Sequence, residues 1–164
     1  MKKIFYLFLI CVSLLILDNT IITFFSINHI YPSLLFIFIV SYSIINGAEE
    51  GVVLGIFAGA LQDLYFFNGT GINMLTNMLI CVIAAEIGKG IFKEKSIIPI
   101  VSTFLLSFLK GLMILVILFL MKIKSTDISV VLYKALYDMI VCVLIYRFVF
   151  KLSETKTMKK EWRF

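Results

Sequence analysis

The sequence predicts an all-α integral membrane protein, a bundle of six transmembrane helices with both termini in the cytoplasm. Hydrophobic residues make up 62% of the 164 residues and charged residues 15%, whereas about a quarter of a soluble domain is charged. The hydrophobic residues are gathered in six runs, each close to the roughly 20 residues that a membrane-spanning helix needs. The basic residues, moreover, fall mostly on one side of the predicted bundle.

The first three expected spans cover residues 4–25, 32–46 and 51–67. The first follows two lysines, as in a signal peptide, but no small-residue cleavage site comes after it, so we expect it to remain as a span. Pro32 is expected in the first turn of the second span, where the missing N–H group has no partner in any case. The residues between the second and third spans are expected to form a tight link.

The last three expected spans cover residues 72–87, 97–121 and 128–150. The segment Asn-Gly-Thr-Gly before the fourth span has the composition of a turn. A basic loop is expected over residues 88–96, and a short loop over residues 122–127. The chain is therefore expected to form one transmembrane domain over residues 1–150, followed by a basic cytoplasmic tail over residues 151–164.

The distribution of positive charge predicts the orientation. One side of the bundle holds Lys2, Lys3, Lys89, Lys93, Lys95, Lys151, Lys156, Lys159, Lys160 and Arg163, and the other holds only Lys122 and Lys124. Basic residues near the ends of spans favour the cytoplasmic side. Because this bias explains the formal net charge of +5, no nucleic-acid partner is expected.

A series of glycines occupies the third span. Gly47, Gly51, Gly55 and Gly59 recur every four residues, and Asp63 continues the spacing. Each four-residue step advances about 40° around a helix, so the series follows a slowly winding groove. Glycine lets another backbone come close, which stabilises helix contacts in membranes. Packing within the chain is the more common use of such a series, and contact with a partner chain is the alternative.

Several ionisable residues lie inside the expected spans. Lys110 and Asp138 fall near the middle of the fifth and sixth spans. Pairing of opposite charges offsets a burial cost of several kcal/mol, so we expect a Lys110–Asp138 ion pair. Lys134, four residues before Asp138, is an alternative partner. The roles of Asp18 and Glu86 stay open, and deep charges can also mark a path for protons or ions.

Two asparagines, Asn73 and Asn77, lie one turn apart on the fourth span. They can line a small-molecule pocket or form hydrogen bonds with a neighbouring helix, which is more common. The single histidine, His29, lies in an expected loop, and the sequence has no metalloprotease, nucleophile-elbow or P-loop motif. The sequence therefore predicts no catalytic, metal-binding or cofactor-binding residues, and a protein that is not an enzyme.

Residues 32–87 resemble the family of the rod shape-determining protein MreD. That family shows a proline opening an apolar helix, glycines at four-residue spacing, an aspartate after them, and a glycine at the start of the next helix. The matching positions here are Pro32, Gly47, Gly51, Gly55, Gly59, Asp63 and Gly71. Two positions depart from the pattern, since Ala60 stands where leucine is usual and Gln62 adds a polar group just before the aspartate.

The resemblance implies a multi-pass protein of the bacterial cytoplasmic (inner) membrane, acting as a scaffold or regulator of cell elongation without catalysis of its own. The partners it implies are the bitopic protein MreC and, less directly, MreB, RodA and a class B penicillin-binding protein, with membrane lipids around the bundle. In this interpretation Gly51, Gly55 and Gly59 pack helices closely, and Asp63 is a polar anchor near the outer face, where it can meet an MreC-like helix.

The resemblance also implies a fold similar to the substrate-binding S components of energy-coupling-factor vitamin transporters. An S component is therefore the alternative function. Such components usually carry alanines in the first helix for docking their transport module. Here no alanine precedes Ala48, which favours the scaffold.

Overall fold

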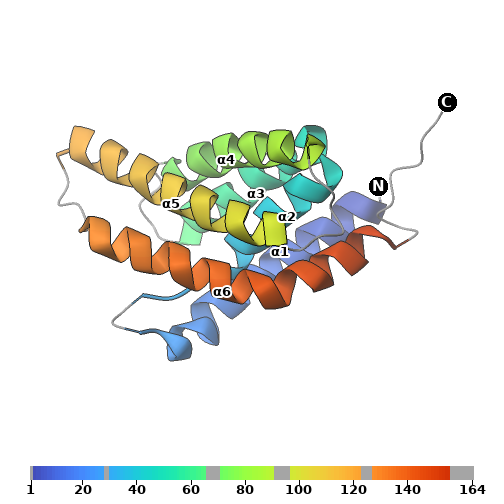
Figure 1. Ribbon diagram of the computed structural model, residues 1–164, viewed down its shortest axis with the longest axis horizontal. Coiled ribbons are helices and arrows are strands. Elements are labelled where there is room, and N and C mark those ends of the chain that lie inside the picture. Colours follow the sequence, from blue (N-terminus) through green and yellow to red (C-terminus); the bar gives the residue numbers. More distant parts are fainter. Residues whose placement is uncertain (1, 28–29, 66–70, 91–96, 123–126, 156–164) are drawn as a thin grey trace.

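The computed structural model describes residues 2–27, 30–65, 71–90, 97–122 and 127–155. These residues form six α-helices and one short 3-10 helix (Figure 1). The helices are α1 (Lys2–Thr20), η1 (Ile22–Phe25), α2 (Leu34–Asn46), α3 (Ala48–Tyr65), α4 (Ile72–Lys89), α5 (Ile97–Leu120) and α6 (Ile128–Ser153). The all-helical prediction is therefore confirmed for the described residues.

Four of these helices, α1, α4, α5 and α6, are long and apolar enough to cross a membrane. The other two are different in kind. Helix α2 is apolar but has only 13 residues, a length of about 20 Å. Helix α3 has 18 residues but carries two glutamates in its first turn. The described residues thus have the composition of a helical membrane bundle with two less typical members.

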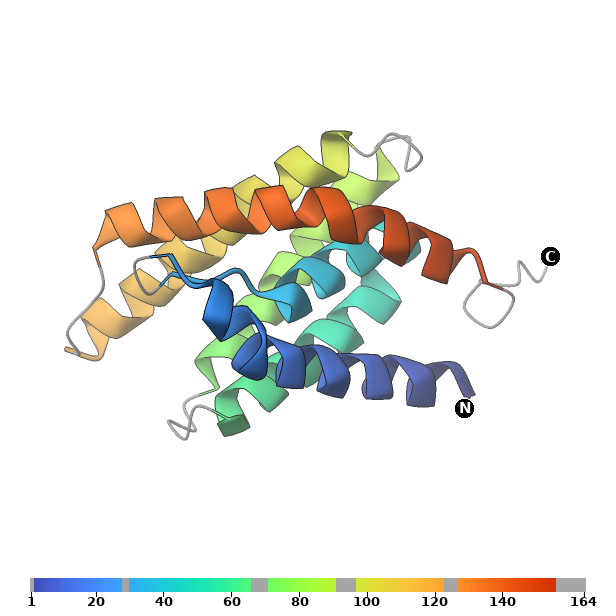
Figure 2. The same ribbon diagram turned by 90° about the horizontal axis from the view of Figure 1, so that it is seen from below.

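Helix α2 is the core of the bundle. All of its residues from 35 to 44 are buried, and it contacts each of the other five α-helices. A helix that is apolar on all sides is expected to be enclosed by others, and Figures 1 and 2 show α2 between them. Because protein rather than lipid surrounds it, α2 does not need to match the bilayer in length.

The most extensive helix contacts are made by two pairs of consecutive, antiparallel helices. Helix α3 packs most extensively against α4, and α5 packs along α6. The start of α1 and the end of α6 lie at the same end of the bundle in both views (Figures 1 and 2). The start of α6 lies at the opposite end (Figures 1 and 2). The end of α1 lies against the start of α2, and the start of α2 lies inside the bundle.

Two expected boundaries before α2 need correction. The first α-helix ends at Thr20, and the chain continues as η1. Pro32 precedes helix α2 rather than opening it, because Ser33 is the N-cap residue and accepts a hydrogen bond from the N–H of Phe36. Ser33 supplies a side-chain acceptor for an N–H group that the helix cannot satisfy itself.

The link between α2 and α3 is shorter than predicted. Only Gly47 separates the two helices, with a φ of +93° that favours glycine. Glu49 and Glu50 therefore lie in the first turn of α3, where the helix dipole stabilises negative charge. The predicted turn at residues 68–70 and the tail beyond residue 155 lie outside the described residues.

Candidate functional site

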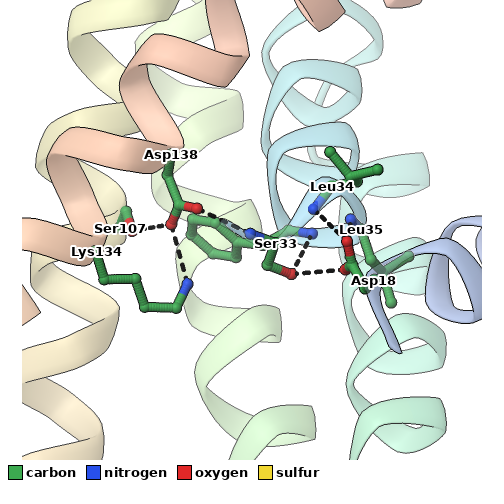
Figure 3. A network of polar contacts seen from close by, with 8 residues as sticks. Asp18, Ser33, Leu34, Leu35, Ser107, Lys134 and Asp138 are labelled. Carbon is green, nitrogen blue, oxygen red and sulfur yellow. Dashed lines mark hydrogen bonds and ion pairs between the residues drawn. The ribbon is translucent and has the colours of Figure 1, made fainter. Parts of the chain in front are cut away.

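The N-terminus of α2 is an unusual place for a helix to begin, because it lies inside the bundle. The first N–H groups of a helix have no intrahelical acceptor, and the membrane interior offers no water to replace it. Asp18, near the end of α1, accepts hydrogen bonds from the N–H groups of Leu34 (2.7 Å) and Leu35 (3.1 Å) and from the hydroxyl of Ser33 (3.0 Å). A buried carboxylate therefore caps α2 from another helix (Figure 3).

A second buried carboxylate completes this cap. Asp138, on α6, accepts hydrogen bonds from the N–H of Ser33 (2.9 Å), the hydroxyl of Ser107 (2.5 Å) and the ammonium of Lys134 (3.1 Å). Ser33 thus contacts both aspartates, one through its N–H and the other through its hydroxyl (Figure 3). The network joins α1, the start of α2, α5 and α6, which are distant in the sequence.

The expected Lys110–Asp138 ion pair is not formed among the described residues. Asp138 pairs with Lys134, the alternative partner, which lies one turn earlier on the same helix and so already faces the carboxylate. The ammonium of Lys110 lies over the ring of Phe36 instead, 4.8 Å from its centroid. This distance is typical of a cation–π interaction.

The glycine series faces helix α4 through two of its members. A Cβ atom on Gly55 would lie 2.9 Å from the carbonyl oxygen of Asn77, and one on Gly59 would lie 2.6 Å from the carbonyl oxygen of Asn73. Both distances are shorter than a carbon–oxygen contact allows. The backbones of α3 and α4 therefore come close enough that only glycine fits at these positions.

The other glycines of the predicted site have different positions. Gly51 faces the Ser43 side chain on α2. Gly47 and Gly71 have φ angles of +93° and +67°, and a Cβ atom on either would meet no atom within 4 Å. The structure therefore places Gly51 at a helix contact, whereas Gly47 and Gly71 serve the backbone path at helix ends.

Asp63 lies one turn after Gly59 and caps helix α4. Its carboxylate accepts hydrogen bonds from the N–H (3.1 Å) and side-chain amide (3.1 Å) of Asn73 and from the N–H of Met74 (2.9 Å). Only 9% of Asp63 is exposed, so its carboxylate is directed at α4 rather than outward. Close approach at Gly59 brings the start of α4 within reach of this side chain.

A cavity of about 160 Å³, largely apolar in surface but with several polar side chains in its lining, lies beside the two capped helix ends. Its lining residues come from α1, α3, α4, α5 and α6 and from the segment directly before α2. They are Leu15, Asp18, Asn19, Tyr31, Ser33, Gln62, Asn73, Ser107, Lys110, Gly111, Ile114, Val131 and Lys134. The two asparagines of the sequence analysis have separate roles, because Asn73 lines this cavity and Asn77 donates to Gln62 (3.0 Å).

A family model for the rod shape-determining protein MreD matches residues 1–156. The chain belongs to the MreD family. The match covers nearly the whole chain, whereas the resemblance in the sequence rested on residues 32–87. No curated protein and no solved structure gives a match. The role of this MreD-family protein is therefore in rod shape determination.

In this MreD-family chain, a smaller polar cluster lies at the other end of the bundle. Glu50 accepts hydrogen bonds from Lys3 (2.6 Å) and from the hydroxyl of Tyr42 (2.7 Å), which connects α1, α2 and α3. Glu86 forms an exposed ion pair with Lys89 at 2.6 Å. The partner of Glu86 is therefore a surface lysine one turn away.

The sequence did not predict that Ser33, Asp18 and Ser107 meet at the start of α2. Ser33 lies directly before an apolar run, which is a recognisable N-cap signal, but the helix was expected to begin at the preceding proline. Asp18 lies fifteen residues earlier, and Ser107 lies on another helix. No local pattern connects these positions, so only the packing of the helices reveals that they meet.

Proposed function

We propose that this protein is a non-enzymatic membrane scaffold of the cell-elongation machinery. It binds an MreC-like bitopic protein and helps to organise peptidoglycan synthesis by RodA and a class B penicillin-binding protein, with MreB acting indirectly. The observation that carries this proposal is the MreD family match over residues 1–156. Rod shape determination requires wall synthesis to be organised in space, which a scaffold without its own catalysis can do.

The internal contacts support a scaffold because they fix the shape of the bundle. The carboxylates of Asp18, Asp63 and Asp138 all accept hydrogen bonds from other helices or their N-termini. Gly55 and Gly59 hold α3 and α4 together. We propose that these residues serve partner binding indirectly, by setting the outer surface that α3 and α4 present, rather than by touching the partner.

We further propose six membrane crossings in the bacterial cytoplasmic membrane, with both termini in the cytoplasm. The start of α1 and the end of α6 lie at one end of the bundle (Figure 1), as an even number of crossings requires. Lys3 and Lys151 lie at that end, and basic residues near the ends of spans favour the cytoplasm. The fold proposed is similar to that of energy-coupling-factor S components.

Affinity purification of the tagged protein from native membranes in mild detergent tests the function. We expect an MreC-like bitopic protein and wall-synthesis enzymes to remain bound, and an unrelated tagged multi-pass protein to retain neither. Recovery of a transport module with ATPases would overturn the scaffold and support the S-component alternative, which the cavity lined by Asn73 favours. Depletion of the protein from cells should, independently, convert rods into rounded cells.

A further inference from the structure

The ammonium group of Lys110 is an isolated positive charge deep in the bundle. Lys110 lies ten residues before the end of α5, about 15 Å along the helix, and it lines the cavity. Within the described residues its one close partner is the ring of Phe36. An aromatic ring stabilises a cation only partly, and within the same described residues none of the three N–H donors of Lys110 has an oxygen acceptor.

The neighbouring carboxylates do not supply such an acceptor. Both oxygens of Asp18 accept from the start of α2, and both oxygens of Asp63 accept from the start of α4. Asp138 accepts from Ser33 on one oxygen and from Ser107 and Lys134 on the other. Every oxygen of these three carboxylates therefore already accepts a hydrogen bond, and none of the carboxylates forms an ion pair with Lys110.

Gln62 offers a second unused donor to the same cavity. Its side-chain oxygen accepts from Asn77 at 3.0 Å, which leaves its amide NH2 group without an acceptor among the residues that the structure describes. The residue is 7% exposed and lines the cavity. Gln62 and Lys110 thus bring donors from α3 and α5 to one cavity, where both can donate to the same kind of ligand atom.

We propose that this cavity binds a small monocarboxylate, with its carboxylate on Lys110 and Gln62. Lys134 is already paired with Asp138, so Lys110 is the lining cation without an ion pair among the described residues, and one carboxylate supplies its counter-charge. A cavity of about 150 Å³ holds a molecule the size of benzene. The volume of about 160 Å³ therefore admits a carboxylate of few heavy atoms, whose apolar part meets Ile114 and Val131.

The first test compares propionate with its neutral isostere propionamide on the purified full-length protein in detergent or lipid nanodiscs. We expect propionate to raise the unfolding temperature with saturation and propionamide to leave it unchanged at equal concentration, with chloride as the ionic-strength control. Equal shifts by both compounds, or no saturable shift by propionate, would overturn the proposal. The result is independent of the proposed function, because no partner protein is present.

The second test uses Lys110→Met. Without ligand, this variant should be more stable than the wild type, because an uncompensated charge is removed from the membrane interior, and it should lose the response to propionate. Lys89→Met, at an exposed surface pair, should keep the full response. Gln62→Leu should bind propionate about tenfold more weakly, as expected for one lost hydrogen bond. An undiminished response in both Lys110→Met and Gln62→Leu would contradict the site.

Discussion

The N-termini of α2 and α4 solve the same problem in different ways. Each is capped by an aspartate near the end of the preceding helix, Asp18 for α2 and Asp63 for α4. The cap of α4 is local, since Asp63 and Asn73 are ten residues apart. The cap of α2 also requires Asp138, which is 105 residues from Ser33.

The difference follows from where each helix begins. Helix α2 is enclosed by all the other helices, so every N–H group at its start must find an acceptor within the protein. Two carboxylates and the Ser33 hydroxyl supply them. Helix α4 begins at the edge of the bundle, where one carboxylate suffices once Gly59 has let the backbones approach. Deeper burial of a helix end thus requires contacts from more of the chain.

The largest effect is expected from Asp18→Ala. It leaves the N–H groups of Leu34 and Leu35 and the Ser33 hydroxyl without an acceptor, and we expect a loss of about 3 kcal/mol or more in the free energy of unfolding. Asp63→Ala should cost less, about 2 kcal/mol, the upper end for a lost helix cap. Reversible unfolding in mixed micelles with sodium dodecyl sulfate measures both.

Asp127→Ala is the matched control for these two variants. Asp127 is the N-cap residue of α6 but makes no capping hydrogen bond, so we expect a change within about 0.5 kcal/mol. An Asp63→Ala variant that is less stable than Asp18→Ala would show that the enclosed helix end is not the more demanding of the two.

The Gly59→Ala variant tests the close approach of the α3 and α4 backbones that accompanies the cap of α4. Its Cβ atom would meet the backbone of α4, including the N–H nitrogen of Met74 at 2.6 Å, and we expect a loss of about 2 kcal/mol from overpacking. Gly90→Ala is the matched control, because its φ is −95° and the nearest atom to its Cβ is 3.9 Å away. Equal stability of the two variants would mean that α4 moves away without cost.

Much of this fold could be predicted from the sequence. The six apolar runs matched the six helices, because a membrane demands nearly continuous apolar segments. The boundaries failed where local chemistry overrode the apolar pattern. Ser33 rather than Pro32 determines the start of α2, and Gly47 alone forms the turn into α3.

The site was predictable only where its contacts are local. The spacing of Gly55, Gly59 and Asp63 reflects one helix face that packs on α4, and the sequence carries that periodicity. The position of Lys110 over Phe36 depends on how α5 lies against α2. Equal depth in the membrane suggested the wrong partner for Asp138, because depth does not determine which way a side chain points.

A double-mutant cycle between Gly59 and Asp63 tests whether close helix packing and capping at the start of α4 depend on each other. If Gly59 brings the start of α4 within reach of Asp63, then Asp63→Ala should cost about 1 kcal/mol less in the Gly59→Ala background, within the range for neighbouring residues. Asp18→Ala should cost the same in both backgrounds, because its contacts are on α2. Additive effects for the Gly59 and Asp63 pair would separate close packing from capping.

The smallest effects are expected at the two ion pairs within helices, Lys134–Asp138 and Lys89–Glu86. Asp138 is fully buried while Lys134 is 42% exposed, so solvent screens this pair, and Lys134→Met should cost only about 1 kcal/mol. Lys89 and Glu86 are 67% and 59% exposed, and Lys89→Met should leave the unfolding free energy unchanged. In the same assay Lys110→Met should raise the free energy of unfolding. The changes in this free energy should therefore differ in sign and size among the three lysine variants. A cost for Lys110→Met larger than that for Lys134→Met would contradict the prediction, because it would show that the Lys110 ammonium is stabilised by its surroundings more than the Lys134 ammonium is.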